Sequence, residues 1–260
     1  MTTFIPDIQR FDSLPSTNSE AARQAALGAR EGLCVVAAEQ TAGRGRLQRQ
    51  WLSPRGAGLY FSIVLRPQIE QRYWPLITLA ASLSVREALL QSCNLQTDIK
   101  WPNDILANER KLCGILAETI ETETGRAVVV GIGINLTENA FPPELSEVAT
   151  SVETAHGAPV NLEVVLKALT KSLAQNYQKL QEPDGPSTIV RDWSASSSYS
   201  HGKRVRIVEA DTNFEGITRG LESDGALRVE TDDGEVKVVH AGDVETLRPV
   251  SRSAELIEHK

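Results

Sequence analysis

The sequence predicts an α+β fold, in which a mixed β-sheet is covered by helices and followed by a small β-barrel. Three observations support this prediction. Segments typical of strands alternate with segments typical of helices, and several strand segments are joined directly by short turns. After about residue 200 the strand segments become short and are separated by turn signals such as SDGA and DDGE.

The first elements follow from local patterns. Residues 17–30 are rich in alanine, and Thr17 with Glu20 matches a capping box, so we expect a helix here. LCVVAAEQ at 33–40 and GLYFSIVLR at 58–66 have the composition of two core strands. The first of these leads directly into EQTAGRGRLQRQW, a cationic segment without an apolar run.

The middle of the chain continues the alternation. Residues 73–92 carry apolar side chains at helical spacing. TDIKWPNDILANERKLCGILAETI, residues 97–120, predicts two strands joined at the polar NER turn, and AVVVGIGINL, residues 127–136, predicts another. Residues 161–182 and 187–197 predict two further helices.

The C-terminal part has a different pattern. Five short strands within about fifty residues predict a small β-barrel, and four of them are seen as KRVRIVE, FEGITRGLE, ALRVET and EVKVVH. The serine-rich segment SASSSYSHG precedes them. We therefore expect one large domain at residues 1–200, a barrel at 201–250 and a tail at 251–260.

Charge and composition argue against several classes of function. A net charge of −7 disfavours a general nucleic-acid or membrane coat, because both bind clustered positive charge. The three cysteines are far apart, with no CxxC or Cys/His cluster, so we expect free thiols and no metal site. No signal peptide and no apolar stretch of about 20 residues is present. We expect a cytoplasmic protein that binds neither nucleic acid nor membrane.

The segment VVVGIGINL predicts where a ligand lies. Side chains alternate across a strand, which gives one continuous apolar face from Val128 to Leu136. The other face carries Gly131, Gly133 and Asn135. Glycine inside a strand often means that something approaches the backbone closely. We expect a ligand to lie flat on this stripe, and the alternative is a crossing helix that fills the space.

Neither glycine pair completes a phosphate fingerprint. GRGRLQ and GIGINL both lack the third glycine of GxGxxG, and neither contains GK[ST], which disfavours a Rossmann or P-loop nucleotide site. The GRGR segment can still fold over an anion, because its arginines offer forked donors suited to phosphate or carboxylate. An exposed Arg/Gly loop without a ligand is the alternative.

Four segments together resemble the biotin–protein ligases, in order and in spacing. They are PSTN at 15–18, EQTAGRGRLQRQW at 39–51, KWPNDILANERKLCGILAE at 100–118 and VGIGIN at 130–135. The likeness covers about residues 8–200, and the C-terminal strands match the small SH3-like barrel that many members carry. PSTN begins at residue 15 and leaves no room for a helix-turn-helix domain, so the resemblance is to the monofunctional type.

The resemblance implies a two-step ligase with a catalytic domain like that of class II aminoacyl-tRNA synthetases. The carboxylate of biotin attacks the α-phosphate of ATP, with Mg²⁺, and gives biotinyl-5′-AMP and pyrophosphate. A lysine of a biotin carboxyl carrier domain, as in acetyl-CoA carboxylase, then attacks the mixed anhydride and forms an amide. In the family the GRGR loop folds over biotin and the adenylate, and closure excludes water from the anhydride.

The resemblance also implies which residues bind biotin. Ser16, Thr17 and Asn18 match the segment whose hydroxyl and amide groups meet the ureido ring, with helix capping as an alternative role. Gln40 matches a biotin contact, and Gly114 is expected beside bound biotin. Lipoate would leave the ureido-binding groups unpaired at a large energetic cost, which favours biotin as the substrate.

Other matched positions belong to the loop and to the adenylate site. Arg44, Gly45 and Arg46 match the part that folds over both biotin and the adenylate, with Arg46 holding the adenylate and Arg44 supporting the closed loop. Trp51 is expected to close over the ligand, with core packing as the alternative. Asn135 matches a residue near the adenine.

Lys111, Asp104 and Arg46 are the expected catalytic residues. Lys111 in RKLCGIL matches the lysine that contacts the biotin carboxylate and the α-phosphate, where a fixed ammonium stabilises the growing negative charge. Asp104 is expected to orient the acceptor lysine and take its proton, because an amine attacks only when neutral. Lys100 is expected to add positive potential.

Three other functions were weighed. A lipoate–protein ligase uses the same adenylate chemistry, but GRGR and KWPND favour biotin. A biotin-responsive repressor is disfavoured, because such a repressor carries an N-terminal helix-turn-helix domain for which PSTN at residue 15 leaves no room. A catalytically dead binding module is disfavoured because Lys111, Arg46 and Asp104 are all present. The sequence leaves open the oligomeric state, a homodimer included, and the identity of the acceptor.

Overall fold

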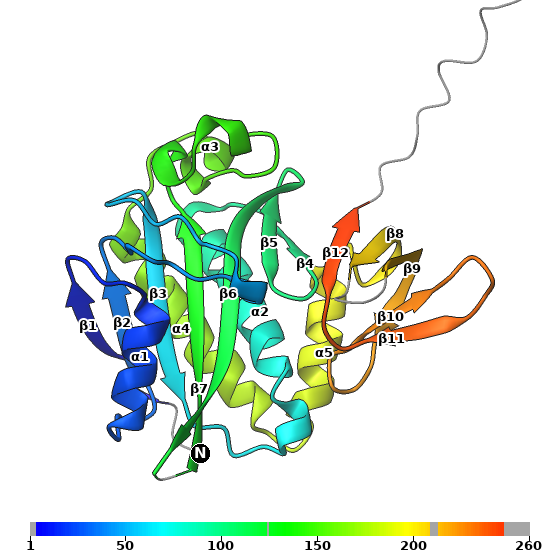
Figure 1. The fold of residues 1–260 in the computed structure, drawn as a ribbon, viewed down its shortest axis with the longest axis horizontal. Coiled ribbons are helices and arrows are strands. Elements are labelled where there is room, and N and C mark those ends of the chain that lie inside the picture. Colours follow the sequence, from blue (N-terminus) through cyan, green and yellow to red (C-terminus); the bar gives the residue numbers. More distant parts are fainter. Residues whose placement is uncertain (1–3, 124, 209–212, 247–260) are drawn as a thin grey trace, which may run out of the picture.

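The computed structural model of the chain describes residues 4–123, 125–208 and 213–246. These residues form two β-sheets, and helices pack against the larger one (Figure 1). The larger sheet has the strand order β1-β2-β3-β7-β6-β5-β4, and the smaller has the order β11-β10-β9-β8-β12. The predicted α+β fold with a small C-terminal β unit is confirmed. The predicted tail at 251–260 lies outside the described residues.

The large sheet is mixed. β1 and β2 pair in parallel, and every other pair of neighbouring strands in this sheet is antiparallel. Its strands are β1 (Asp7–Phe11), β2 (Leu33–Ala37), β3 (Gly58–Leu65), β4 (Asp98–Lys100), β5 (Asp104–Ala107), β6 (Arg110–Thr122) and β7 (Gly125–Asn135). The small sheet consists of β8 (His201–Val208), β9 (Asn213–Leu221), β10 (Leu227–Glu230), β11 (Val236–Val239) and β12 (Asp243–Thr246). The helices are α1 (Thr17–Ala26), α2 (Leu76–Cys93), α3 (Val152–His156), α4 (Leu162–Leu180) and α5 (Gly185–Ser196).

The two faces of the large sheet bury different helices. Alternation along β7 places Val128, Val130 and their neighbours in a core shared with α2, α4 and α5. Val129 lies on the opposite face, in a smaller core with Ala21 and Ala25 of α1. Helix α1 covers only part of this face, and the segment between β2 and β3 crosses the sheet above it (Figure 1). The glycine stripe lies where the start of α1 meets this crossing segment.

The first helix is shorter than predicted, and its cap was assigned wrongly. It ends at Ala26, because the chain turns at Gly28 with a φ of 90°. Ser16 is the N-cap, and its hydroxyl accepts a hydrogen bond from the Ser19 amide. Glu20 is therefore one position too late for a capping box and pairs instead with Arg23 at 2.7 Å. Thr17 is left free for contacts outside the helix.

Residues 97–120 contain one more strand break than predicted. The NER turn is confirmed, since Asn108 and Glu109 have φ values of 50° and 62° and join β5 to β6. A second turn at residues 101–103, around a cis Trp101–Pro102 bond, separates β4 from β5. The predicted strand at 33–40 likewise ends at Ala37, and the predicted helix at 73–92 begins after Pro75.

The C-terminal sheet is joined closely to the large sheet. Trp101 is 3% exposed, and its indole nitrogen donates to the carbonyl of Gly225 at 3.0 Å. Gly225 also faces Leu76 and Leu79 of α2. This junction fixes β12 beside the end of β4, as Figure 1 shows. Residues of β12 are thereby brought to the edge of the uncovered sheet face.

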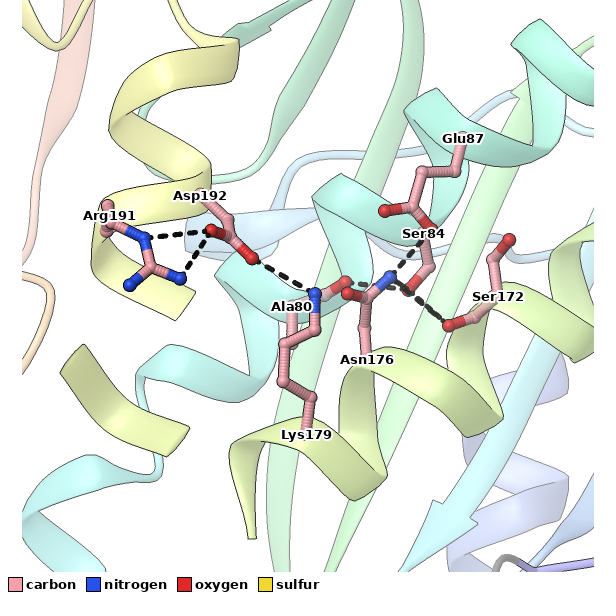
Figure 2. Close-up of polar contacts among 8 residues, drawn as sticks. All are labelled: Ala80, Ser84, Glu87, Ser172, Asn176, Lys179, Arg191 and Asp192. Carbon is pink, nitrogen blue, oxygen red and sulfur yellow. Dashed lines mark hydrogen bonds and ion pairs between the residues drawn. The ribbon is translucent and has the colours of Figure 1, made fainter. Parts of the chain in front are cut away.

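A polar cluster lies between the helices on the other face of the sheet, and we call it the helix-layer cluster (Figure 2). Asn176 of α4 is 2% exposed, and its amide nitrogen donates to Glu87 at 2.9 Å and to Ser84 at 3.2 Å. Nearby, Lys179 forms an ion pair of 3.0 Å with Asp192 of α5. These contacts tie α2, α4 and α5 together.

Two predictions on thiols and membrane segments concern the described residues. The three cysteines are free and buried, as predicted, and burial raises the pKa of Cys34 to about 12. Over the described ranges, no helix combines the length and apolar character needed to cross a bilayer.

Candidate active site

A cavity of about 520 Å³ opens on the α1 face of the large sheet, next to the N-terminus of α1. This volume falls within the range of small-molecule sites, about 300–1,000 Å³. All twelve residues to which we gave a primary role line it: Ser16, Thr17, Asn18, Gln40, Arg44, Gly45, Arg46, Trp51, Asp104, Lys111, Gly114 and Asn135. Lys100 lines it as well, so the fold brings the whole predicted set into one space.

The glycine stripe on β7 is covered by protein side chains. A Cβ atom at Gly131 would overlap Asn18 Oδ1, and one at Gly133 would lie 2.5 Å from the Trp51 ring. Trp51 also covers Gly114 on β6, the register partner of Gly133. The alternative of a covering helix is therefore correct at Gly131, and a ligand on the rest of the stripe stays a prediction. A ligand reaches the backbone of Gly133 only if Trp51 moves.

Trp51 is held without a polar partner. Its indole nitrogen is buried and has no hydrogen-bond partner among the described residues. The Lys111 ammonium lies 5.6 Å from the ring centroid, a cation–π distance. A buried donor without a partner costs roughly 1–3 kcal/mol. The position of Trp51 on the stripe is thus one from which a ligand can displace it at reduced cost.

One end of the cavity carries a continuous polar network, which we call the cavity network. The Thr17 amide donates to Gln40 Oε1 at 2.8 Å, and the Thr17 hydroxyl lies 3.1 Å from the same oxygen. The Gln40 amide donates to Ser53 at 2.8 Å. Ser62 of β3 lies within 2.6 Å of Asn18 Oδ1 and 2.8 Å of the Thr17 hydroxyl. Hydroxyl and amide groups from three separate segments therefore meet at one place.

The cationic loop, residues 43–50, is fastened by carboxylates at two places. Arg44 pairs with Glu118 of β6 at 2.5 Å. Arg46 donates to Asn103 Oδ1 at 3.1 Å and to the Gly242 carbonyl at 3.2 Å. Asp243 of β12 forms an ion pair with Arg49 at 2.5 Å and lies 3.6 Å from Arg46. The C-terminal sheet thus holds the loop over the cavity.

Arg46 is the most enclosed arginine of the loop, with 24% of its side chain exposed. Burial lowers its pKa from the ordinary value, and the carboxylates of Asp243 and Asp104 oppose that shift. An arginine remains charged in spite of such a shift. Arg46 therefore brings a permanent, poorly hydrated positive charge into the cavity, where it acts strongly on an anion.

Lys111 and Asp104 face each other inside the cavity. The ammonium of Lys111 lies 2.7 Å from Asp104 Oδ1, with side chains 38% and 20% exposed. The backbone of Lys111 is held by residues 148–150, since its amide donates to the Val148 carbonyl and its carbonyl accepts from the Thr150 amide. The two expected catalytic groups are therefore paired with each other in this structure.

Two further predicted residues support this arrangement. Burial lowers the pKa of Lys100, and the nearby positive charge of Lys111 lowers it further. The carboxylates of Asp104, Asp243 and Glu245 oppose this shift. Asn135 is 5% exposed, and its amide nitrogen donates to the Thr150 carbonyl at 3.1 Å. Asn135 thus also holds the segment that positions Lys111.

Comparison with known proteins identifies the family. A family model described as "Biotin/lipoate A/B protein ligase family" matches residues 10–135, and one described as "Biotin protein ligase C terminal domain" matches residues 200–247. The chain is 37% identical over 237 residues to the bifunctional ligase/repressor BirA of Bacillus subtilis, covering 90% of this chain and 72% of that protein. It belongs to the biotin–protein ligase family.

Further similarity within the biotin–protein ligases is consistent with this assignment. The biotin–[acetyl-CoA-carboxylase] ligase of Mycobacterium tuberculosis is 33% identical over 239 residues, covering 90% of this chain and 86% of that protein. A solved biotin protein ligase from Aquifex aeolicus, in complex with biotin and ATP, has a TM-score of 0.81 and 28% identity. It matches over 94% of this chain and 100% of that chain.

Sequence reasoning assigned no role to four residues that the structure places at the site: Ser62, Asn103, Glu118 and Asp243. Ser62 had a detectable signal, because it is the one serine inside the buried segment GLYFSIVL and pairs in register with Gly131. Glu118 and Asn103 lie within the motif KWPNDILANERKLCGILAE. Asp243 had no local signal, because only tertiary packing brings β12 to the loop.

Proposed function

We propose that this chain is an ATP-dependent biotin–protein ligase, which forms biotinyl-5′-AMP and then transfers biotin to a lysine of a carrier domain. One observation carries the proposal: a single cavity combines a polar network at one end with the charges of Lys111, Arg46 and Asp104 at the other. The similarity to the Aquifex ligase in complex with biotin and ATP supports it.

We assign the ureido ring of biotin to the cavity network. The ring offers one carbonyl acceptor and two N–H donors, and it needs partners of both kinds. The hydroxyls of Ser16 and Thr17 and the amide of Gln40 supply both kinds at the cavity wall. Asn18 braces this wall from the α1 side. Lipoate lacks the ureido group and would leave these groups unpaired, so we favour biotin over lipoate.

We assign the first step to the opposite end of the cavity. A carboxylate oxygen of biotin attacks the α-phosphorus of ATP, the bond to the β-phosphate oxygen breaks, and pyrophosphate leaves. Lys111 would leave Asp104 and place its ammonium between the biotin carboxylate and the α-phosphate, where it stabilises the charge that grows in the transition state. Arg46 would hold the phosphate of the adenylate.

We assign the second step to Asp104. Once Lys111 has moved to the ligand, the Asp104 carboxylate is free to take a proton from the ammonium of the acceptor lysine. The neutral amine attacks the acyl carbon, an amide bond forms and AMP leaves. The loop, held by Glu118 and Asp243, would exclude water from the anhydride until the acceptor arrives.

The residues at the site do not form a magnesium cage. Within residues 4–246 as described, no group of three or more His, Cys, Asp and Glu side chains can hold a metal ion. Two of the carboxylates that line the cavity, Asp104 and Asp243, are each paired with a basic side chain. Mg²⁺ commonly binds through substrate phosphates and keeps several waters. We expect it to come with ATP, and the steps above do not pass through it.

The test is direct. The purified chain is incubated with labelled biotin, ATP, Mg²⁺ and a biotin carboxyl carrier domain, and the carrier is analysed by mass spectrometry. We expect one biotin per carrier, and none when the target lysine is replaced by arginine. A parallel reaction with lipoate in place of biotin shows which of the two acids the protein attaches to the carrier. Absence of both carrier labelling and biotin-dependent ATP–pyrophosphate exchange would contradict the proposal.

The partner and location follow from the same proposal. The Mycobacterium relative is named for acetyl-CoA carboxylase, so a carrier domain of that enzyme is the first acceptor to try. We expect the chain to act in the cytoplasm, where its three buried thiols stay reduced. The Bacillus relative is named a repressor as well as a ligase. We predict that this chain binds no operator DNA, and a biotin-dependent gel shift at physiological salt would show otherwise.

A further inference from the structure

Glu118 occupies a special place on β6. In register, Gly114 pairs with Gly133, Leu116 with Gly131 and Glu118 with Val129, so Glu118 lies on the α1 face just beyond the glycine stripe. This face is otherwise apolar where α1 packs, with Val129 and Ala25 in the small core. A carboxylate with 28% of its side chain exposed is unusual there and calls for partners.

Its two partners come from two separate segments of the site, the cationic loop and the start of α1. Arg44 of the cationic loop donates to Glu118 Oε2 at 2.5 Å. Asn18 at the start of α1 donates to the same oxygen at 2.9 Å. One carboxylate oxygen therefore joins the loop to the cavity network.

The contact also determines which way the Asn18 amide points. A carboxylate only accepts hydrogen bonds, so it binds the NH₂ end of the amide. The Leu116 carbonyl selects the same end at 3.2 Å. Asn18 Oδ1 is then left toward Ser62, whose hydroxyl donates at 2.6 Å. Ser62 has then given its one proton to Asn18 and can only accept from the Thr17 hydroxyl, 2.8 Å away, so the orientation is passed on along the cavity network.

Glu118 holds the first half of the cationic loop, whereas the C-terminal sheet contacts only the second half. Asp243 holds Arg49 and lies beside Arg46, both in the second half of the loop. Arg44, in the first half, is 45% exposed and pairs only with Glu118 among the ion pairs of the described chain. Loss of Glu118 would free this half of the loop while the other half stays fastened.

We propose that Glu118 is a positioning residue that sets the affinity of the site for the ureido end of the acid substrate. It fixes the Asn18 amide and holds Arg44, so that the loop and the cavity network close on the ligand together. It touches no reacting atom. The inference rests on the proposed function for its substrate, but not for its effect on the loop.

The chain offers a matched control on the same strand. Glu121 of β6 also pairs with an arginine, Arg126, at 2.7 Å. Its side chain is 75% exposed, and the pair lies in the β6–β7 hairpin, away from the cavity. Glu118→Gln and Glu121→Gln therefore remove the same charge from the same strand, and only the first touches the loop.

The first measurement needs no ligase activity. Trypsin is added to the folded protein without ligands, and cleavage within residues 43–50 is followed by mass spectrometry. We expect Glu118→Gln to be cut about 5-fold faster than the wild type, the order expected when one partly exposed ion pair is lost. Glu121→Gln should match the wild type. Equal rates for all three proteins would overturn the fastening of the loop.

The second measurement concerns the substrate. In biotin-dependent ATP–pyrophosphate exchange, Glu118→Gln should raise KM for biotin about 5- to 10-fold, with KM for ATP and kcat changed less than about 2-fold. An unchanged KM for biotin, or an equal rise in Glu121→Gln, would overturn the positioning role. If the wild type shows no exchange with biotin, the proposed function fails, and the cleavage result still decides the role of Glu118 in the loop.

Two further variants separate positioning from loss of folding. Glu118→Asp keeps the charge on a shorter side chain, and it should fall between the wild type and Glu118→Gln in both measurements. In an Arg44→Gln background, Glu118→Gln should change cleavage less than about 2-fold, because the partner is already gone. A variant that only lowers the unfolding temperature, with both measurements unchanged, would show a purely structural role.

Discussion

Two buried asparagines in this protein have nearly the same partners and serve different purposes. Asn18 donates to a glutamate at 2.9 Å and to a backbone carbonyl at 3.2 Å. Asn176 in the helix-layer cluster does the same, also at 2.9 and 3.2 Å (Figure 2). Each lies within hydrogen-bond distance of a buried serine, Ser62 or Ser84.

The difference lies in what surrounds each cluster. Asn18 lines the cavity, and its glutamate also holds Arg44 of a loop that crosses that cavity. The Asn176 side chain reaches from α4 to α2, and its partners belong to these two helices, which pack against the same core. A buried polar network thus indicates a functional site only when it borders a cavity and reaches a movable segment. Otherwise it serves to align helices.

Two ion pairs give the same contrast between the cavity and the helix layer. Lys111–Asp104 in the cavity and Lys179–Asp192 in the helix layer have lysine side chains 38% and 37% exposed, at 2.7 and 3.0 Å from their carboxylates. Their burial and geometry are almost equal, so differences in function must come from position. Substitutions at matched positions test this.

The largest expected effect is that of Lys111→Ala. Loss of one preorganised donor to a developing charge lowers rates by about 10²–10³-fold. We expect this loss in kcat for biotin-dependent ATP–pyrophosphate exchange. Lys179→Ala, the matched control, should keep kcat within about 2-fold. Normal exchange by Lys111→Ala, or an equal loss in Lys179→Ala, would remove the distinction between the two ion pairs.

The asparagines are expected to separate binding from stability. Asn18→Ala should raise KM for biotin about 10-fold, because the cavity network loses its brace and a buried hydroxyl loses its partner. Steady-state kinetics at saturating ATP measures this. An unchanged KM would show that the cavity network is as structural as the helix-layer cluster.

Asn176→Ala should instead lower the free energy of unfolding by about 1–3 kcal/mol, because Glu87 and Ser84 lose a buried donor. Urea denaturation followed by circular dichroism gives this value. KM for biotin and kcat should stay at wild-type level. A kinetic change without loss of stability would mean that the helix layer communicates with the cavity.

The smallest expected effect concerns pH. Burial acts to raise the pKa of Asp192, but hydrogen bonds from Lys179 and Arg191 outweigh it, so the net pKa lies below the ordinary value. A carboxyl with a lower pKa in the folded state stabilises the protein above its unfolded pKa, about 3.9, and this contribution is lost as pH falls through the folded pKa. Asp192→Asn should therefore lose slightly less stability than the wild type between about pH 5 and 2.

Differences in urea midpoint between Asp192→Asn and the wild type, measured across that range, check this prediction. The difference should be largest near neutral pH and should shrink on acidification. A difference that stays constant with pH would mean that the ion pair contributes nothing measurable, as is common for partly exposed pairs.

Local pattern predicted most of the elements, and it erred where two local signals competed. Strand β3 has nearly the predicted bounds, because GLYFSIVL is apolar, β-branched and bounded by glycine and proline. At the start of α1, Ser16 and Thr17 are both good caps, and the sequence cannot tell which hydroxyl the first turn uses. The turn at residues 101–103 was missed because it begins with the apolar Trp101, whereas the predicted NER turn is polar throughout.

The sequence by itself determined the family motifs, the alternation of β7 and the thirteen predicted residues that line the cavity, because each of these is encoded in short segments. Only the tertiary structure decided that Trp51 and Asn18 cover the glycine stripe, and that Glu118 and the C-terminal sheet fasten the loop. These contacts join residues 74 and 196 positions apart in the chain. No local pattern encodes such a contact, since it depends on how the sheets pack and which side chains fill the space between them.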